Sequence, residues 1–140
     1  MCIFCSIVCG DSPASFLHQD DRCVAFLNIR PIYPGEFMVI PREHIDHFTD
    51  IRDDLAGHIM IVAQRLGRRM LSEFKPVRIG YVVHGFGVPH AHLNVVPQYD
   101  PGDIISAKHV VVEGNSFRIS EEDLTSPSRD ELDAIASRFK

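Results

Sequence analysis

The feature that most restricts the fold of this 140-residue chain is one long amphipathic segment, residues 49–74. Thr49 or Asp50 can cap its start, and Pro76 marks its end. Apolar side chains recur along it every three or four residues, the spacing of a helix that buries one face: Ile51, Leu55, Ile59, Val62, Leu66, Met70 and Phe74. A helix of this kind needs a second layer to cover that face.

Short apolar runs on both sides of the helix predict the strands of that second layer. Residues 23–29 and 36–41 are two such runs, separated by a turn rich in proline and glycine. Residues 77–85 and 91–99 predict two more neighbouring strands after the helix. The order of these elements favours an α+β fold, an antiparallel sheet of about five strands with one long helix packed on a face.

The C-terminal part of the chain carries weaker signals. We expect one domain whose main part is residues 1–105, with residues 106–140 as a C-terminal extension of it. In the extension, residues 108–114 predict an edge strand. A terminal helix follows, with Ser128 and Glu131 spaced as a capping box.

Composition excludes several classes of function. The chain is 45% hydrophobic, enough for one packed core, and its net charge of −5 predicts no nucleic-acid partner. No apolar run reaches the roughly 18 residues of a membrane span. The apolar start lacks the basic residues of a signal peptide, so a cytoplasmic location is expected. There, the four cysteines favour free thiols or metal ligands over disulfides.

The segment "VPHAHLNVVP", residues 88–97, alternates polar and apolar side chains. On a strand, His90, His92 and Asn94 would stand in a row on one face, because successive side chains point to opposite faces. The side chains between them are apolar and would face the core: Ala91, Leu93 and Val95. This pattern predicts a polar row backed by packed residues.

His92 is the candidate nucleophile of the row. A neutral imidazole can attack phosphorus when its other nitrogen donates to a fixed acceptor. The preceding loop contains His84, and its backbone amides, including those of Gly87 and Val88, can donate to phosphate oxygens. The simpler alternative is a structural histidine that only satisfies its own hydrogen bonds.

Cys2 and Cys5 have the spacing of a zinc-binding pair, and His44 and His90 are candidates for the two further ligands of a closed site. Alternatively, Cys2 frays with the terminus and Cys5 packs as a small apolar residue. Two other cysteines lie outside this spacing, and we interpret them as packing residues: Cys9 and Cys23.

The long helix has a second, weaker apolar face. Its members indicate either ordinary surface scatter or a contact between subunits: Ala56, Met60, Gly67 and Leu71.

In three segments the chain resembles the histidine triad (HIT) family of nucleotide hydrolases and transferases, and in particular its zinc-binding bacterial members with a Cys-x-x-Cys pair. The segments are "CIFCSIV", "DDRCVAFLNIRPIYPGEFMVIPREHI" and "VPHAHLNVVP", which together span roughly residues 2 to 100. The resemblance implies a HIT-like nucleotide-binding domain and a homodimer formed partly through the long helix. It also implies that His92 attacks the α-phosphate of a nucleotide conjugate and forms a nucleotidyl-histidine intermediate, with His90 and Asn94 beside it. In the zinc-binding members, the ligands correspond to Cys2, Cys5, His44 and His90.

We expect a purine nucleotide or nucleotide conjugate as the small-molecule partner. Its base would lie in an apolar pocket, its ribose beside Asn28, and its phosphate near Gly87 and Val88. The apolar residues are Ile3, Phe4, Ile7 and Phe26.

Three positions depart from the family pattern. Asn94 replaces the third histidine and can donate a hydrogen bond but not act as an imidazolium acid. Asn28 replaces the aspartate that binds ribose. The loop before the row is shorter than in the hydrolases and lacks their Gly-Gln-Ser or Gly-Gln-Thr. The first interpretation is therefore a HIT-type nucleotidyl hydrolase or transferase that cleaves esters, anhydrides or phosphoramidates. The alternatives are a non-catalytic nucleotide-binding regulatory module stabilised by zinc, and a zinc-stabilised interaction domain that binds no nucleotide.

Overall fold

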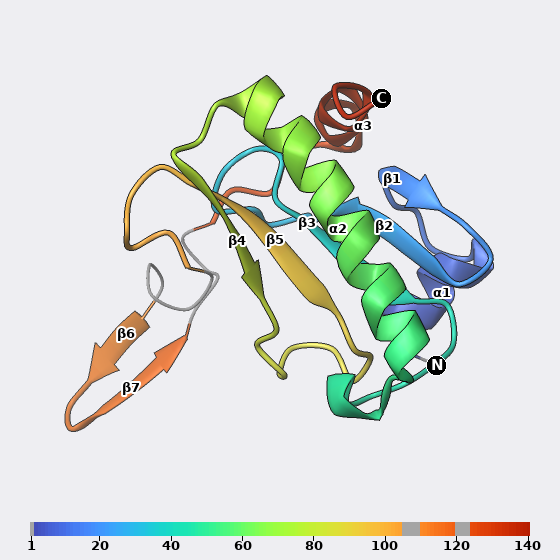
Figure 1. Ribbon diagram of the computed structural model, residues 1–140. Helices are drawn as coiled ribbons and strands as arrows, with labels where there is room; N and C mark the ends of the chain where they lie inside the picture. Colours follow the sequence, from blue (N-terminus) through green and yellow to red (C-terminus); the bar gives the residue numbers. More distant parts are fainter. Residues whose placement is uncertain (1, 105–109, 120–123) are drawn as a thin grey trace.

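A computed structural model describes residues 2–104, 110–119 and 124–140 of the chain (Figure 1). Three α-helices, a short 3₁₀ turn and seven strands follow one another in these ranges: α1 Ile3–Cys9, β1 Phe16–Gln19, β2 Cys23–Leu27, β3 Phe37–Pro41, the turn Phe48–Asp50, α2 Asp53–Phe74, β4 Arg78–Val82, β5 Leu93–Gln98, β6 Val110–Glu113, β7 Ser116–Ile119 and α3 Arg129–Ser137.

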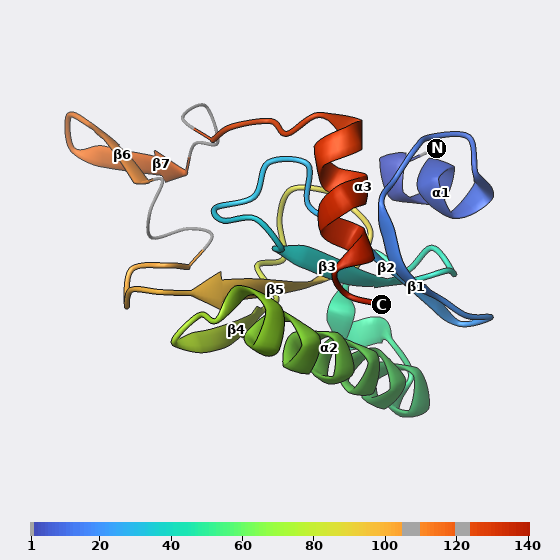
Figure 2. The same cartoon turned by 90° about the horizontal axis from the view of Figure 1, so that it is seen from above.

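Five strands form one antiparallel sheet in the order β1-β2-β3-β5-β4. Helix α2 lies along one face of this sheet, and the short helix α1 lies near the β1–β2 end (Figures 1 and 2). The predicted α+β fold, with five antiparallel strands and one long helix on a face, is confirmed.

Alternation along the strands divides the core into two layers. In β2, Cys23, Ala25 and Leu27 pack into the layer beneath α2. Their neighbours Val24 and Phe26 pack on the other face, in a cluster that contains residues of α1. All five residues of β2 are buried, as expected for a central strand with both faces covered.

The apolar stripe of α2 packs on the sheet as its periodicity predicts, with five side chains that are at most 8% exposed: Leu55, Ile59, Val62, Leu66 and Met70.

The predicted cap of α2 is wrong. Thr49 and Asp50 belong to the 3₁₀ turn, and the residue that caps α2 is Arg52, which makes no side-chain capping bond. Helix α2 ends at Phe74, and the residue that caps this end, Lys75, adopts a left-handed conformation before Pro76.

The second apolar face of α2 is only partly available for a partner. Met60 and Leu71 are 46% and 47% exposed. Gly67, however, is buried within the chain. The hydroxyl group of Tyr81 lies so close to it that a Cβ atom at this position would collide with that group. The face open to solvent therefore centres on Met60 and Leu71.

Part of the strand expected at residues 108–114 lies outside the described residues. The described part, β6, pairs with β7 in a separate two-stranded sheet and is not an edge of the main sheet. Gly114, with a φ of 60°, allows the tight turn that brings the chain back onto itself. The predicted cap of α3 is confirmed, because the Ser128 side chain accepts a hydrogen bond from the amide of Glu131. Among the helices of the described ranges, none has the length and hydropathy to cross a bilayer.

Candidate active site and metal centre

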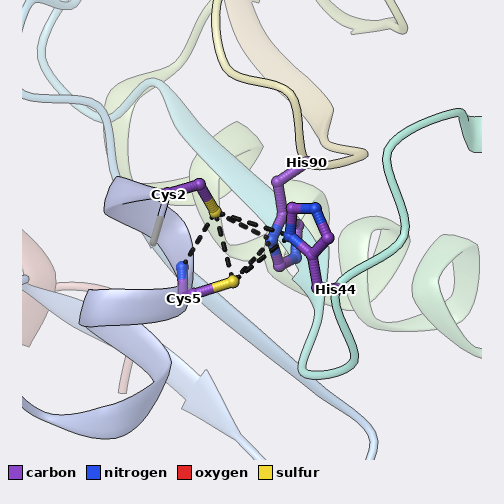
Figure 3. Close-up of side chains that lie close together, drawn as sticks. All are labelled: Cys2, Cys5, His44 and His90. Atoms are coloured by element: carbon purple, nitrogen blue, oxygen red, sulfur yellow. Dashed lines mark hydrogen bonds between the residues drawn. The ribbon is translucent and has the colours of Figure 1, made fainter.

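The four predicted metal ligands lie together at the start of α1 (Figure 3). The Sγ atoms of Cys2 and Cys5 are 3.2 Å apart, and the Nδ1 atom of His44 is 3.6 Å and 3.2 Å from them, respectively. The Nδ1 atom of His90 lies 3.5 Å from Sγ of Cys2 and 3.6 Å from Sγ of Cys5. Cys2 also caps α1, since its sulfur accepts a hydrogen bond from the amide of Cys5.

These separations fit a tetrahedral zinc site. Bonds of about 2.3 Å to sulfur and 2.0–2.1 Å to nitrogen place neighbouring ligand atoms about 3.4–3.8 Å apart, close to the separations seen here. His90 is fully buried, and its Nε2–H donates to the carbonyl oxygen of Pro41 at 2.8 Å. This bond leaves Nδ1 with a lone pair directed at the thiols. Burial also lowers the pKa of His90, which keeps the ring neutral as a metal ligand must be.

The other two cysteines lie apart from this cluster. Cys23 is buried in the core, as predicted. Cys9 is exposed at the end of α1, so its interpretation as a packing residue is wrong. A seven-residue helix has one narrow buried face, here formed by Phe4 and Ile7, and Cys9 lies off it.

The polar row is only partly on a strand. Strand β5 begins at Leu93, so His90 and His92 precede it, contrary to the expectation that all three polar residues lie on the strand. The backbone amides of this segment bond outside the sheet. The amide of His90 donates to the carbonyl of Val88, and that of Ala91 donates to the carbonyl of Ile45. The alternation nevertheless persists, because the apolar neighbours pack beneath α2 as predicted: Ala91, Leu93 and Val95.

The hydrogen bond of His92 fixes its tautomer. Its Nδ1 lies 2.8 Å from the carbonyl oxygen of His90, which has no proton to give, so Nδ1 carries the hydrogen and donates it. Nε2 is then left with its lone pair. The Phe4 ring packs edge-on against the imidazole, with the ring centroids 5.4 Å apart.

His92 lines a cavity of about 600 Å³ on the face of the sheet opposite α2. All seven predicted nucleotide-binding residues line it with His92 and Asn94: Ile3, Phe4, Ile7, Phe26, Asn28, Gly87 and Val88. His90 does not line this cavity, because its ring faces Cys2, Cys5 and His44. Sequence reasoning missed further lining residues, such as Met38 from β3 and the 78% exposed Phe86. A strand pattern does not show which of two buried faces borders a cavity.

Asn28 is already engaged in hydrogen bonds. Its Nδ2 donates to Oε2 of the buried Glu36 at 2.5 Å, and its Oδ1 accepts from the amide of Arg30 at 2.8 Å. One amide hydrogen and one oxygen lone pair are left for a ligand. Asn94 is also held, because its Nδ2 donates to the carbonyl oxygen of Val82 at 3.3 Å.

Comparisons with known proteins agree with this geometry. The HIT domain family matches residues 10–101. The Protein hit of Bacillus subtilis (strain 168) is 32% identical over 107 residues, which cover 73% of this chain and 74% of that relative.

Two solved structures extend the likeness to three dimensions. A zinc-bound histidine triad family protein from Mycobacterium smegmatis aligns with a TM-score of 0.70 at 26% identity, covering 98% of this chain and 94% of that one. A HIT family hydrolase from Legionella pneumophila Philadelphia 1 aligns with a TM-score of 0.58 at 32% identity, covering 69% of this chain and 91% of that one. With the match over residues 10–101, these findings show that the chain belongs to the HIT domain family, the histidine triad proteins.

Proposed function

We propose that this protein is a nucleotidyl hydrolase or transferase that uses His92 as its nucleophile. The observation that carries the proposal is the 2.8 Å bond from Nδ1 of His92 to the carbonyl oxygen of His90, in a ring that lines the cavity. This bond prepares Nε2 for attack, and the membership of the HIT family supports the same role.

The chemistry proceeds in two displacements. Nε2 of His92 attacks the α-phosphorus of a nucleotide conjugate, a phosphorus–nitrogen bond forms, and the bond to the leaving group breaks with its electron pair. Water or another acceptor then attacks the same phosphorus, and the nucleotide leaves His92. The amides of Gly87 and Val88 lie in a loop with positive φ at Gly85 and Gly87, a geometry suited to anionic oxygens.

The apolar part of the cavity takes the base, which we propose is a purine. Its lining there comes from α1 and β2, including Phe4, Ile7 and Phe26. Asn28 borders the same cavity and offers its remaining hydrogen-bonding capacity to ribose hydroxyls.

The proton for the leaving group needs a source other than Asn94. The amide of Asn94 cannot supply one, and it is partly occupied by Val82. His84 also lines the cavity and is exposed to solvent. We therefore assign His84 as the general acid that replaces the third histidine of the family pattern.

Cys2, Cys5, His44 and His90 would hold one zinc ion, whose contribution is structural. The zinc-bound Mycobacterium smegmatis relative supports this assignment. The ion would fix α1, which lines the cavity, to the segment that carries His92. The resemblance to the family further supports a homodimer built partly on α2.

Covalent trapping tests the proposal. The protein is mixed with a nucleoside 5′-phosphoramidate labelled at the α-phosphorus, denatured within the first turnover, and analysed by peptide mapping. We expect a label on His92, none in His92→Ala, and a full label in the control His18→Ala, whose side chain on β1 does not line the cavity.

Two other outcomes would replace the proposal. The hydrogen bond from Asn94 to Val82 favours one alternative, a nucleotide-binding module without turnover. Reversible nucleotide binding without any label would establish that module. No binding at all would leave a zinc-stabilised interaction domain.

A further inference from the structure

A second cluster of metal-ligating side chains lies on the α2 face of the sheet, away from the nucleotide cavity. His18 comes from β1, Asp20 from the turn after it, Cys23 from the start of β2, and His58 from α2. Their ligand atoms all lie within 4.8 Å of one another. Cys23 packs in the core layer beneath α2, so the sheet separates this cluster from the cavity that His92 lines.

Asp20 is the centre of the cluster. Its Oδ1 accepts hydrogen bonds from the backbone amides of Arg22 and Cys23, both at 2.8 Å, which fixes the carboxylate. Its Oδ2 lies 2.6 Å from Nε2 of both His18 and His58, and 3.7 Å from Sγ of Cys23. Burial alone would raise the pKa of Asp20, but the hydrogen bonds from His18 and the backbone outweigh it and hold the pKa below its usual value. The carboxylate is therefore ionised at neutral pH.

We propose that His18, Asp20, His58 and Cys23 form a second site for a divalent transition-metal ion of the zinc class. Two imidazoles, one carboxylate and one thiolate are ligand types that such ions accept in tetrahedral geometry. Binding requires each imidazole to carry its proton on Nδ1, which frees Nε2, and the thiol of Cys23 to lose its proton to solvent. The carboxylate and the thiolate then balance the charge of the ion.

The ligands need only a small rearrangement to receive the ion. Bonds of 2.0–2.1 Å would separate the nitrogen and oxygen ligand atoms by about 3.3 Å, so Oδ2 must retreat by roughly 0.7 Å from each imidazole. The side chains of His18 and His58 are 32% and 21% exposed, which leaves them room to adjust. Cys23 is the weakest of the four ligands, because burial and the neighbouring Asp20 raise the pKa of its thiol to about 12.

The competing interpretation is a purely structural network. Two neutral imidazoles that donate to one carboxylate would join the β1–β2 turn to α2 without any ion. The two interpretations differ in metal content, so metal content decides between them.

The experiment measures zinc per chain after purification without chelator and equilibration with micromolar zinc followed by desalting. We expect two ions in the wild type, one in Cys5→Ser, one in His58→Gln and none in the double variant. His47→Gln is the control for an exposed histidine outside both clusters and should keep both ions. A wild type that holds one ion, lost in Cys5→Ser and kept in His58→Gln, would overturn the proposal.

A second readout does not depend on the folding of His58→Gln. In the Cys5→Ser background, cobalt(II) should bind with the absorption of a site that has at most one thiolate, and zinc should raise the melting temperature. His18→Gln, a change in a side chain on β1 that is 32% exposed, should remove both effects. If Cys5→Ser binds no cobalt and zinc leaves its melting temperature unchanged, the cluster is only a hydrogen-bonded network.

Discussion

His92 donates a hydrogen bond from Nδ1 to the carbonyl oxygen of His90, only two residues before it in the chain. His90 in turn donates from Nε2 to the carbonyl oxygen of Pro41 and points its Nδ1 at the two thiols. The two histidines therefore carry their protons on opposite nitrogens. The carbonyl of the first orients the ring of the second, and in the proposed function the first binds a metal and the second attacks phosphorus.

This relationship predicts that the zinc ligands affect both stability and the nucleophile. Cys5→Ser should lose one zinc ion per chain and about 2 kcal/mol of folding free energy, a decrease in melting temperature of roughly 4–8 °C. The label on His92 should form more slowly, because α1 and His90 are less firmly held. Metal analysis, thermal unfolding and the trapping assay measure the three effects.

Cys9→Ser is the matched control, since Cys9 lies on the same helix but is exposed and outside the cluster. It should keep the zinc content and the melting temperature of the wild type. Equal losses in Cys5→Ser and Cys9→Ser would show that the thiols act only through the helix and not through a metal.

Strands β2 to β5 and helix α2 could be predicted because their signal is local periodicity, whereas the short edge strand β1 was not predicted. Between Leu55 and Met70, apolar side chains recur at helical spacing. The strands either alternate apolar and polar side chains or are wholly apolar, so the pattern predicts which side chains are buried. The start of α2 could not be predicted in this way. Threonine is a preferred capping residue and arginine is not, so the sequence favours Thr49 over Arg52. There, the path of the chain through the 3₁₀ turn decides where the helix begins.

The sites were harder to predict than the fold, because they depend on contacts between residues far apart in the sequence. The Cys2–His90 contact joins residues 88 positions apart, and the resemblance to a family supplied the partners. The sequence does not predict the cluster around Asp20. His58 is 38 positions from Asp20 in the chain, and the spacing of Cys23 indicates a packing residue. Only the folded arrangement, in which α2 packs on the sheet, brings His58 to the carboxylate of Asp20.

The pair of Asn28 and Glu36 predicts a cost for restoring the family's aspartate. Asn28→Asp would replace the donor that lies 2.5 Å from the buried carboxylate with a second carboxylate. The lost bond and the charge repulsion should lower the free energy of unfolding by about 1–3 kcal/mol. Chemical denaturation at neutral pH measures the change.

Adding Glu36→Gln to Asn28→Asp provides the sharper test. The glutamine amide can donate to the new aspartate, so the double variant should regain most of the lost stability. Additive losses in the double variant would mean that the two side chains are not coupled.

The exposed part of the second face of α2 predicts the dimer contact. Met60→Glu should shift a dimer toward monomer, because a symmetric interface places the new charge against its own copy or a near neighbour. Ile61→Glu is the control, since Ile61 is 48% exposed, much like Met60 at 46%, but points about 100° away around the helix. Sedimentation at micromolar concentration measures both. If only Ile61→Glu dissociates the protein, the interface lies on the other side of α2.

The roles of Asn94 and His84 predict a dependence on the leaving group. With His84 as the acid, His84→Gln should slow substrates with poor leaving groups by about 10²- to 10⁴-fold, the usual contribution of general acid catalysis, and should change good leaving groups little. Asn94→His places an imidazole in the cavity at the third position of the row, and it should raise activity most on the poorest leaving groups. Turnover rates for a series of nucleoside esters whose leaving groups differ in pKa measure the effect of each substitution on poor and good leaving groups.

Combining the two changes separates an acid from a merely structural histidine. If the imidazoles are interchangeable proton donors, Asn94→His should recover most of the activity that His84→Gln loses. Asn94→Ala, which removes the bond to Val82, should weaken nucleotide binding and still allow the label on His92. A uniform loss in His84→Gln across all leaving groups would contradict the acid role. Its cause would then lie in the loop itself, where the rings of His84 and Phe86 lie 5.9 Å apart at the edge of the cavity.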